Sequence, residues 1–488
     1  MENKTIFADF YEFTMGQSYF YGGKKDKEVV FDLFFRKNPF QGGYTITAGL
    51  DNIIDYIKNF KFTDKQINFL RKQGTFSEEY LEYLKNLKFV GDVYAIPDGE
   101  VVFPNEPIVT VKTNIIMAQL IETALLANFN HGSLVTTAAK RIVMAASGRP
   151  IMEFGGRRAR GIDSAVEASK YGYIGGCVGT SNTKAGLDHD VPLSGTMAHS
   201  LVTEEDSEYD AFLNYAKANP TNAIFLVDTY DTLRSGIPNA IRVAREFLIP
   251  NGYEFKGIRI DSGDLAYLSK EARKMLDKAG FRDTKICLSN GLDEYAITEL
   301  LKEGAKVDSI GAGDNIAAAK ERVGGVYKLV AVNNNGEIIP KIKVSEDSIK
   351  TINPAYKKLY RFYDNKTGIA LGDVIALHDE KINKKEYTLV HPTETWKKTE
   401  LKNYTVKELQ VPIFSNGELV YNVPTIQETR DYCTARFETI YPEVKRLTNP
   451  HEYYVDLTDK LRELKQELIE AYTYPNIMET WEKQYEKK

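Results

Sequence analysis

The sequence predicts an α/β protein, with an irregular parallel α/β barrel in the middle, a β-rich N-terminal domain and a C-terminal β-rich and helical part. Three observations predict this fold. Short apolar runs alternate with helical patterns through the central part, as in repeated βα units. Polar side chains directly follow several of these runs. Turn signals between short strand patterns mark the parts on either side.

Each apolar run of the central part is too short for a helix, and several are rich in Val and Ile. These features predict buried strands. The runs are Ile151–Phe154, Ala223–Val227, Gly257–Ile260, Lys285–Leu288, Val307–Ile310 and Val326–Val330.

Helical patterns separate the runs. From Leu265 to Leu276 the apolar residues recur every three or four positions, and Gly280 is expected to end that helix. A similar pattern runs from Leu292 to Leu300 and closes at Gly304. The order strand, polar loop, helix, glycine, strand is typical of parallel βα units.

Polar residues lie just beyond the carboxyl ends of the predicted strands, where barrels and open parallel sheets carry their active sites. Four successive loops of this kind favour a functional site over ordinary solvated loops. The residues are Asp228, Asp231, Asp261, Ser262, Asp264, Ser289, Asn290 and Asp314.

The ends of the chain carry antiparallel signals. Val29–Arg36 alternates, and Glu100–Val111 resembles a strand interrupted by two prolines. Asn333–Gly336 and Ser415–Gly417 predict turns between antiparallel strands. A terminal helix is expected to place four leucines on one face: Leu457, Leu461, Leu464 and Leu468.

The length of 488 residues exceeds what one core usually holds and predicts two or three domains. We expect an N-terminal α+β domain over 1–112 and the barrel over 113–340. A C-terminal domain over 341–488 is expected to pack on the first.

Composition excludes several classes of protein. The formal net charge of −5 provides no general attraction for nucleic acid or for an anionic membrane. Cys177, Cys287 and Cys433 show no paired spacing, so a disulfide framework and a structural zinc site are not expected. The N-terminus has no signal-peptide pattern, and the apolar stretch Ile115–Phe129 is interrupted by polar residues. We therefore expect a soluble, cytoplasmic protein.

Two kinds of segment could bind phosphate. The segment FGGRRAR carries Arg157, Arg158 and Arg160 directly after a predicted strand, where guanidinium groups could bind an anion or simply pair with acids on a helix. The loops Ser289–Gly291 and Gly311–Asn315 could present backbone N–H groups to phosphate, although ordinary βα turns use the same residues. Neither a P-loop nor a dinucleotide-binding motif is present.

Two acidic loops, Asp228–Asp231 and Asp261–Asp264, could hold Mg²⁺, bind ribose hydroxyls or orient a histidine. They could also cap helices, and for Asp264 the capping interpretation is at least as good. His199 lies among small residues in GTMAHS and is the candidate reactive histidine, with His189 as the competing choice.

Taken together, the motifs DFYEFTM, FFRKNPFQGGY, EFGGRRA, GTSN, GTMAHS, VDTYDT, RIDSGD, LSNG and GVYKLV, in this order, closely resemble the nicotinate phosphoribosyltransferase family. The resemblance runs from Asp9 to about Tyr363, with a looser tail. It implies an N-terminal domain plus the irregular barrel of the type II phosphoribosyltransferases, with active sites at a homodimer interface.

The implied reaction joins nicotinate to phosphoribosyl pyrophosphate, with Mg²⁺ present, and couples this step of NAD biosynthesis to ATP hydrolysis through a phosphohistidine. No protein-bound metal site is assigned. By resemblance, His199 is the phosphorylated histidine and Asp228 orients it. Arg259 and Asp261 match the pyridine pocket, and Tyr11 matches an aromatic residue that stacks on the base from the neighbouring subunit.

Further positions follow from the same resemblance. The residues that match substrate-contacting positions are Arg157, Thr180, Ser181, Ser289, Asn290, Gly291, Gly311 and Gly313. The basic residues that match pyrophosphate or ATP contacts are Arg36, Arg322 and Lys328.

The GTSN loop bears on the choice of base. The related nicotinamide enzyme carries an acid in this loop, which would accept a hydrogen bond from an amide but repel a carboxylate. Ser181 and Asn182 are neutral, which favours nicotinate over nicotinamide. The alternatives are a nicotinamide phosphoribosyltransferase and a non-catalytic barrel that acts as a binding protein.

The chain departs from the family pattern at two places. GAGDNIAAAK replaces the more usual phosphate loop, and a later PGxK-like motif appears as PAYK, ending at Lys357.

Overall fold

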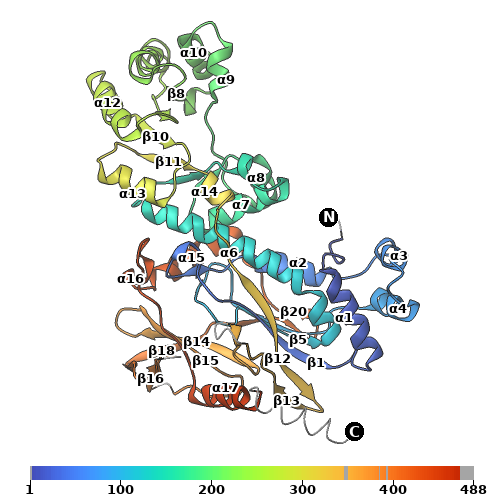
Figure 1. Cartoon of the computed structure of the whole chain (residues 1–488). Helices are drawn as coiled ribbons and strands as arrows, with labels where there is room; N and C mark the ends of the chain where they lie inside the picture. Colours follow the sequence, from blue (N-terminus) through green and yellow to red (C-terminus); the bar gives the residue numbers. More distant parts are fainter. Residues whose placement is uncertain (1–2, 346–349, 384, 392–393, 473–488) are drawn as a thin grey trace, which may run out of the picture. The chain divides into compact units, whose positions relative to one another are not determined.

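The structure is a computed structural model and describes residues 3–345, 350–383, 385–391 and 394–472 (Figure 1). The chain forms two compact units. Unit 1 contains Met1–Leu134, Glu321–Pro424 and Ala435–Lys488, and unit 2 contains Val135–Lys320 and Thr425–Thr434. The expected domain boundaries at 112/113 and 340/341 both fall inside unit 1.

Unit 2 is built on a parallel sheet with the strand order β7-β6-β11-β10-β9-β8. Its strands are β6 (Ile151–Glu153), β7 (Gly179–Thr180), β8 (Ile224–Leu226), β9 (Gly257–Ile260), β10 (Lys285–Ser289) and β11 (Ser309–Ala312). Five of the six predicted runs therefore form strands of this sheet, which confirms the α/β class with a parallel sheet. The two residues of β7 are too few to give a sequence pattern.

The helices of unit 2 lie between the strands along the chain, and α12 and α13 follow β9 and β10 as predicted (Figure 1). The Asp264 carboxylate caps α12 by accepting from the Tyr267 N–H at 2.9 Å, so the capping interpretation holds. The helices of this unit are α7 (Ile162–Ile174), α8 (Thr183–His189), α9 (His199–Glu204), α10 (Glu208–Ala218), α11 (Ile237–Val243), α12 (Leu265–Lys278), α13 (Glu294–Lys302) and α14 (Asp314–Ala317). Short 3-10 or π turns are η2 (Gly156–Arg158), η3 (Pro220–Asn222), η4 (Thr232–Gly236), η5 (Ala244–Leu248) and η6 (Ile249–Asn251).

The prediction that Val326–Val330 belongs to the central parallel series is wrong. It lies in β12 (Gly325–Asn334), which pairs antiparallel with β1 (Glu28–Phe35) in unit 1. Only part of β12 is buried, with Tyr327, Val330 and Ala331 turned inward. A five-residue stretch of a half-buried strand can have the same mostly apolar sequence as a strand that is buried on both faces, and this similarity caused the wrong prediction.

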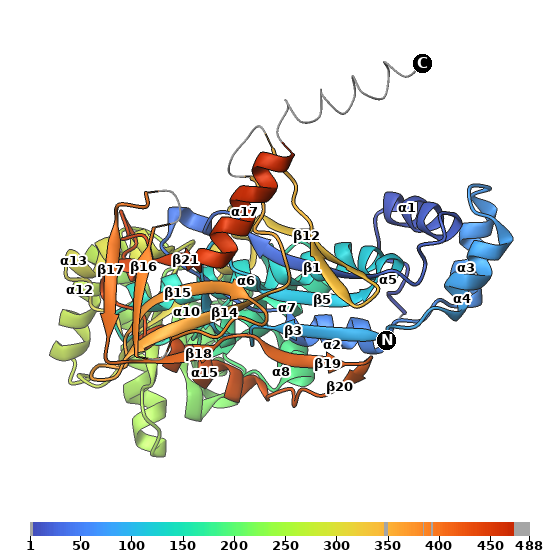
Figure 2. The same cartoon turned by 90° about the horizontal axis from the view of Figure 1, so that it is seen from below.

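Unit 1 contains an antiparallel sheet in the order β13-β12-β1-β5-β3-β19-β20, and Figure 2 shows the strands from β12 to β20 side by side. Its remaining strands are β3 (Gly91–Ala95), β5 (Val109–Asn114), β13 (Glu337–Pro340), β19 (Val411–Ser415) and β20 (Glu418–Leu419). The two predicted turns are confirmed: Gly336 and Gly417 occupy left-handed conformations, with φ of 94° and 87°.

The other strands of unit 1 form three small sheets. β18 (Tyr404–Glu408), β14 (Lys357–Asp364), β15 (Ala370–Leu377) and β21 (Val455–Leu457) make one of them. The other two are the pairs β16 (Glu386–Val390) with β17 (Lys398–Lys402) and β2 (Thr45–Ile46) with β4 (Val101–Val102). Leu457 ends β21, so its placement in the terminal helix is wrong. That helix, α17, begins only after Thr458, whose side chain caps it.

Helices complete the core of unit 1, where Leu33, Val111, Ile116, Leu120 and Ile413 are buried together. They are α1 (Phe10–Tyr21), α2 (Leu50–Lys58), α3 (Asp64–Lys72), α4 (Glu78–Asn86), α5 (Ile115–Leu120), α16 (Pro442–Lys445) and α17 (Asp459–Ala471), with the 3-10 turn η1 (Pro39–Gln41). α6 (Glu122–Ala145) and α15 (Ile426–Glu438) cross the boundary between the units. In the described ranges, we find no helix with both the length and the apolar character that crossing a bilayer requires.

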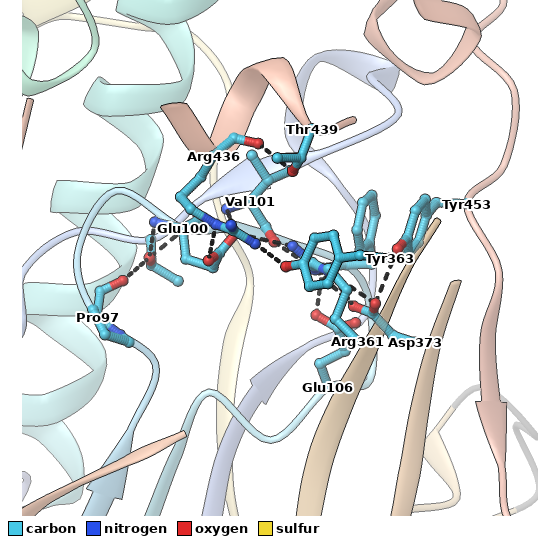
Figure 3. Close-up of polar contacts among 12 residues, drawn as sticks. Pro97, Glu100, Val101, Glu106, Arg361, Tyr363, Asp373, Arg436, Thr439 and Tyr453 are labelled. Atoms are coloured by element: carbon cyan, nitrogen blue, oxygen red, sulfur yellow. Dashed lines mark hydrogen bonds and ion pairs between the residues drawn. The ribbon is translucent and has the colours of Figure 1, made fainter. Parts of the chain in front are cut away.

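A buried charge cluster joins three segments of unit 1 that are far apart in the sequence (Figure 3). The fully buried Arg361 donates to both carboxylate oxygens of Asp373 and to Glu100 at 2.9 Å. Arg436 also pairs with Glu100, at 2.7 Å, and the Tyr453 hydroxyl donates to Asp373 at 2.9 Å. β4, β14 and β15 are thereby tied to α15 around one guanidinium group.

Lys357, at the end of the divergent PAYK motif, is structural in this unit. It is buried, pairs with Asp32 at 2.7 Å and donates to the carbonyls of Asn353 and Ala355. Ala355 has φ of 74°, a conformation that glycine adopts without strain. The glycine of the PGxK-like pattern that the resemblance implies would fit this conformation.

Glu12 on α1 is a buried acid without a cationic partner among the described ion pairs. The Thr123 hydroxyl donates to its Oε1 at 2.6 Å, while Oε2 has no hydrogen-bond donor among the described residues. Burial, together with the charges of Glu122 and Asp9, raises the pKa of Glu12 to about 8.

This raised pKa makes the stability of unit 1 depend on pH. Glutamate in the unfolded chain has a pKa of about 4.3. Folded Glu12 therefore contributes its full stabilisation below that pH, and this contribution is lost as the pH rises through about 8. We expect the free energy of unfolding to fall between about pH 5 and 8 by up to ~1.4 kcal/mol per pH unit more in the wild type than in Glu12→Gln. Urea unfolding across this range measures it. Glu79→Gln, at an exposed position on α4, is the control and should keep the wild-type slope. A Glu12→Gln slope equal to that of the wild type would contradict the prediction.

Candidate active site

The carboxyl ends of β8, β9 and β10 bring several of the predicted site residues together in unit 2. β8 pairs with β9 and β9 with β10, all in parallel register, so the residues that follow each strand meet at one edge. Asp228, Asp261 and Ser289 lie at this edge, and Arg259 occupies the third position of β9. The predicted position at a strand end is therefore found for Asp228, Asp261 and Ser289, and their role as a site stays a prediction.

Arg259 is held in one orientation by neighbours on three sides. It donates to the Ser289 hydroxyl and to Asp261, each at 2.8 Å, and to the Thr196 hydroxyl at 3.3 Å. Its guanidinium carbon lies 5.7 Å from the centre of the Phe154 ring, and the side chain is 15% exposed. A fixed and partly exposed guanidinium is suited to bind a carboxylate that enters from solvent.

Asp228 has one satisfied and one free carboxylate oxygen. Its Oδ2 accepts from the Asp261 backbone N–H at 2.9 Å and from the Ser262 hydroxyl at 2.6 Å. Its Oδ1 is buried and has no donor among the described residues. A buried acceptor without a donor is unfavourable. A contact to this oxygen from a ligand hydroxyl, a cation or a rotated histidine would therefore be strongly stabilising.

His199 is the first residue of α9, and its side chain is 43% exposed. Its Nδ1 lies 3.1 Å from the Thr229 hydroxyl, and its Nε2 lies 4.0 Å from Asp261 Oδ2. The contacts described for Asp228 do not include His199, so the orienting role of Asp228 stays a prediction. Thr229 was missed by sequence reasoning because a threonine beside two acids gives no signal of its own.

The arginine segment begins where β6 ends. Arg157 and Arg158 lie on η2 with exposed side chains, and Arg158 pairs with Asp314 at 3.4 Å. This segment approaches the Gly311–Gly313 loop so closely that a side chain on Gly313 would overlap the backbone of Phe154 and Gly155. Packing alone therefore requires glycine at 313, whatever phosphate contact it makes.

The GTSN loop separates into a buried and an exposed half. Thr180 is fully buried, and Asn182 caps α8 by accepting from the N–H groups of Lys184 and Ala185. Ser181 is exposed between them. Ser181 is therefore the side chain of this loop that can contact a ligand. The sequence predicts this role for both Ser181 and Asn182, but the Asn182 side chain is engaged in capping α8.

The loop after β10 holds an unusual backbone conformation. Asn290 has φ of 119° and Gly291 has φ of 57°, and both are exposed. The Asn315 side chain fixes the loop by donating to the Gly291 carbonyl at 2.9 Å. Strain of this kind at a non-glycine residue is concentrated at functional sites.

Four of the predicted site residues lie in unit 1. Tyr11 on α1 is 46% exposed, and partial burial beside Glu122 raises its pKa to about 12. Arg36 lies 5.7 Å from the Phe34 ring, and its Nε has no acceptor among the described residues. Arg322 is exposed, and Lys328 lies 3.8 Å from Glu122. Within unit 1, Tyr11 and Lys328 thus share Glu122 as a neighbour.

Among the residues that the structure describes, no group of three or more His, Cys, Asp or Glu side chains is arranged to hold a metal ion. The three cysteines are buried, and no disulfide joins them in the part of the chain that the structure describes.

Three family models match the chain. The nicotinate phosphoribosyltransferase N-terminal domain matches residues 6–130, the nicotinate phosphoribosyltransferase family matches 150–367, and the C-terminal domain of the same enzymes matches 356–465.

Curated relatives and solved structures agree with these matches. A nicotinate phosphoribosyltransferase of Bacillus subtilis is 42% identical over 461 residues, which covers 94% of both chains, and one of Rattus norvegicus is 32% identical over 94% of this chain and 96% of its own. The crystal structure of human nicotinic acid phosphoribosyltransferase matches with a TM-score of 0.84 at 30% identity, covering 94% of this chain and 99% of the other. The structure of a nicotinate-nucleotide pyrophosphorylase from Pyrococcus furiosus, at 23% identity and a TM-score of 0.68, covers 90% and 97% and shares the fold.

Proposed function

The chain belongs to the nicotinate phosphoribosyltransferase family of enzymes, and from this premise we propose that it joins nicotinate to phosphoribosyl pyrophosphate. The products are nicotinate mononucleotide and pyrophosphate, in the salvage route of NAD biosynthesis. We further propose that ATP hydrolysis is coupled to the reaction, as in an ATP-dependent ligase.

The observation that carries the choice of substrate is the fixed guanidinium of Arg259. Asp261, Ser289 and Thr196 hold it in place through three hydrogen bonds. A guanidinium group has five N–H donors, so donors remain for a ligand. A pyridine carboxylate can accept the remaining donors, whereas the neutral Ser181 adds no repulsion. This combination supports nicotinate as the base.

Departure of pyrophosphate leaves positive charge on the ribose ring, so the site needs carboxylates facing the sugar and cations facing the leaving group. Asp228 and Asp261 supply the carboxylates. Their oxygens also suit Mg²⁺, since Asp228 Oδ1 has no donor among the described residues. Mg²⁺ bound with the substrate would neutralise the pyrophosphate as it leaves. Arg36, Arg157, Arg322 and Lys328 are the proposed basic contacts to the phosphate groups.

We assign the ATP-dependent step to His199. A ring nitrogen attacks the γ-phosphorus of ATP, the bond from that phosphorus to the bridging oxygen breaks, and ADP leaves. The Thr229 hydroxyl and the Asp261 carboxylate lie on either side of the ring and support one orientation. Later hydrolysis of the phosphohistidine makes the overall ligation favourable.

The assembly is proposed to be a cytoplasmic homodimer in which Tyr11 stacks on the base bound by the partner. The exposed ring of Tyr11 supports this role. We also propose that the parallel sheet of unit 2 is the irregular barrel of the family, and the isolated parallel bridge between Thr180 and Leu193, beyond β7, supports continuation of the sheet there.

The test offers nicotinate, nicotinamide or quinolinate to the purified protein with phosphoribosyl pyrophosphate and Mg²⁺, with and without ATP. We expect mononucleotide from nicotinate, more of it with ATP, and loss of the ATP effect in His199→Ala. Turnover of nicotinamide in preference to nicotinate would overturn the choice of base. Turnover of no base at all would support a binding protein.

Exchanging the exposed residue of the GTSN loop tests base selection directly. In Ser181→Asp, the new carboxylate repels nicotinate and accepts a hydrogen bond from the nicotinamide amide. We expect kcat/KM for nicotinate to fall about tenfold or more, equivalent to ~1.4 kcal/mol, with a smaller loss for nicotinamide. Steady-state kinetics with both bases provides the measurement. Ser181→Asn is the matched neutral control, and an equal loss for both bases in Ser181→Asp would refute the charge argument.

A further inference from the structure

The buried acid Glu153 lies at the junction of the loops that carry Arg157 and Ser181. It is the last residue of β6 and is fully buried. Its backbone pairs with Thr180 of β7 on one side and Ala312 of β11 on the other. Glu153 is the first residue of the motif EFGGRRA, and the sequence alone gives this acid no role.

The carboxylate of Glu153 accepts hydrogen bonds from both loops. The Gly155 N–H donates to its Oε1, and the hydroxyls of Ser169 and Thr180 donate to its Oε2 at 2.9 and 2.7 Å. The backbone carbonyl of Glu153 also accepts from the Ser181 N–H at 3.1 Å. One residue thus contacts the start of the arginine loop and two successive residues of the GTSN loop.

No cation pairs with Glu153 in any ion pair that the described residues form. A buried carboxylate without a cation is unfavourable unless several dipoles solvate it, and here one N–H and two hydroxyls do so. If Glu153 lost this acceptor, the Gly155 N–H would be left buried and unsatisfied, while the Ser169 and Thr180 hydroxyls would turn to the Ala165 carbonyl and to Ser169 Oγ, each 3.0 Å away. The loops are therefore expected to shift when the acceptor is removed.

We infer that Glu153 is a positioning residue that holds the arginine loop and the GTSN loop in one mutual geometry. This role rests on the proposed function, because those loops carry Arg157 and Ser181. Arg157 is a proposed phosphate contact and Ser181 the proposed determinant of base choice, so losing Glu153 disturbs the binding of both substrates at once. Displacements of about 1 Å in such loops can lower rates about a hundredfold.

The experiment compares Glu153→Met with Glu153→Gln. Methionine fills a similar volume and accepts almost nothing, whereas the glutamine carbonyl can accept from Gly155 N–H while its amide donates to the Ser169 and Thr180 hydroxyls. We expect Glu153→Met to lower kcat/KM for nicotinate about a hundredfold and to raise the KM for both substrates. We also expect it to lower the ratio of kcat/KM for nicotinate to kcat/KM for nicotinamide, which measures the preference between the bases. Glu153→Gln should restore activity to within about tenfold of the wild type.

The control variant is Glu208→Met, at another buried acid of unit 2 that accepts from Ser235 and Asn239. It should lower the melting temperature without changing the preference between the two bases. If Glu208→Met narrows that preference as much as Glu153→Met, the effect is general destabilisation and the inference is overturned. The inference is also overturned if Glu153→Gln is as impaired as Glu153→Met. Glutamine keeps the hydrogen bonds but not the charge, so that result would mean that the negative charge of Glu153, and not its hydrogen bonds, is required.

Hydrogen–deuterium exchange gives a readout that does not depend on activity. The Gly155 amide donates to the Glu153 side chain, so it should exchange slowly in the wild type and in Glu153→Gln, and faster in Glu153→Met. Unchanged exchange at Gly155 in Glu153→Met would overturn the positioning role. If the wild type turns over no base, the proposed function fails, and this exchange measurement still decides whether Glu153 orders the two loops.

Discussion

Gly236→Ala is expected to reduce catalysis at least about a hundredfold. Gly236 ends η4, directly behind the strand end that carries Asp228. A Cβ at this position would lie 2.6 Å from the Val227 carbonyl carbon and closer still to its oxygen. Backbone atoms cannot rotate away as a side chain does, so Val227 and the adjoining Asp228 must move. Asp228 would then lose its alignment with Asp261 and Ser262.

The measurement is kcat/KM for nicotinate, with thermal unfolding recorded on the same samples. Gly304→Ala is the control, because Gly304 also lies in unit 2 and has φ of 81°, with no atom near its missing side chain. It should lower stability by about 1 kcal/mol and leave kcat/KM unchanged. If Gly236→Ala is no more impaired than Gly304→Ala, the close approach at Val227 does not position Asp228.

Local patterns predicted the parallel part of the fold well, because each βα unit carries its own signals. Gly257–Ile260 matches β9 at both ends, and the helix after it is capped by Asp264 and closed by Gly280, as its sequence indicates. Val326–Val330 was placed in the wrong sheet because partner choice depends on residues about 300 positions away in β1. A five-residue run that is mostly apolar contains no information about that partner.

The candidate site shows the same limit. Asp228, Asp261 and Ser289 could be grouped from sequence because each follows or ends a strand at the same edge, whereas Arg259, inside β9, was assigned only by resemblance. Thr229, Thr196, Glu153 and Gly236 could not, because their roles come from contacts across the sheet and between loops. Whether His199 meets Asp228 or Asp261 also depends on loop conformations that a motif does not specify.

The buried cluster around Arg361 illustrates a stabilising feature that no local pattern could predict, since Arg361 and Glu100 are 261 positions apart. Burial, together with the charge of Asp373, raises the pKa of Glu106 beside this cluster well above its usual range. Within the same cluster, the positive charges of Arg361 and Arg436 face the negative charges of Glu100 and Asp373. Among the described ion pairs of the cluster in Figure 3, Asp373 pairs with Arg361, whereas Glu100 pairs with both arginines.

Arg361→Met is therefore expected to destabilise unit 1 by about 3–5 kcal/mol, because it leaves the buried Asp373 carboxylate without its cation and Glu100 with Arg436 alone. Urea unfolding at pH 7 measures the loss. Lys358→Met, on the same strand, removes a more exposed pair with Glu408 and should cost at most about 1 kcal/mol. The double variant Arg361→Met/Asp373→Leu should recover part of the loss, since it also removes the uncompensated charge of Asp373. If Arg361→Met costs no more than Lys358→Met, the cluster does not stabilise the junction of β4, β14, β15 and α15.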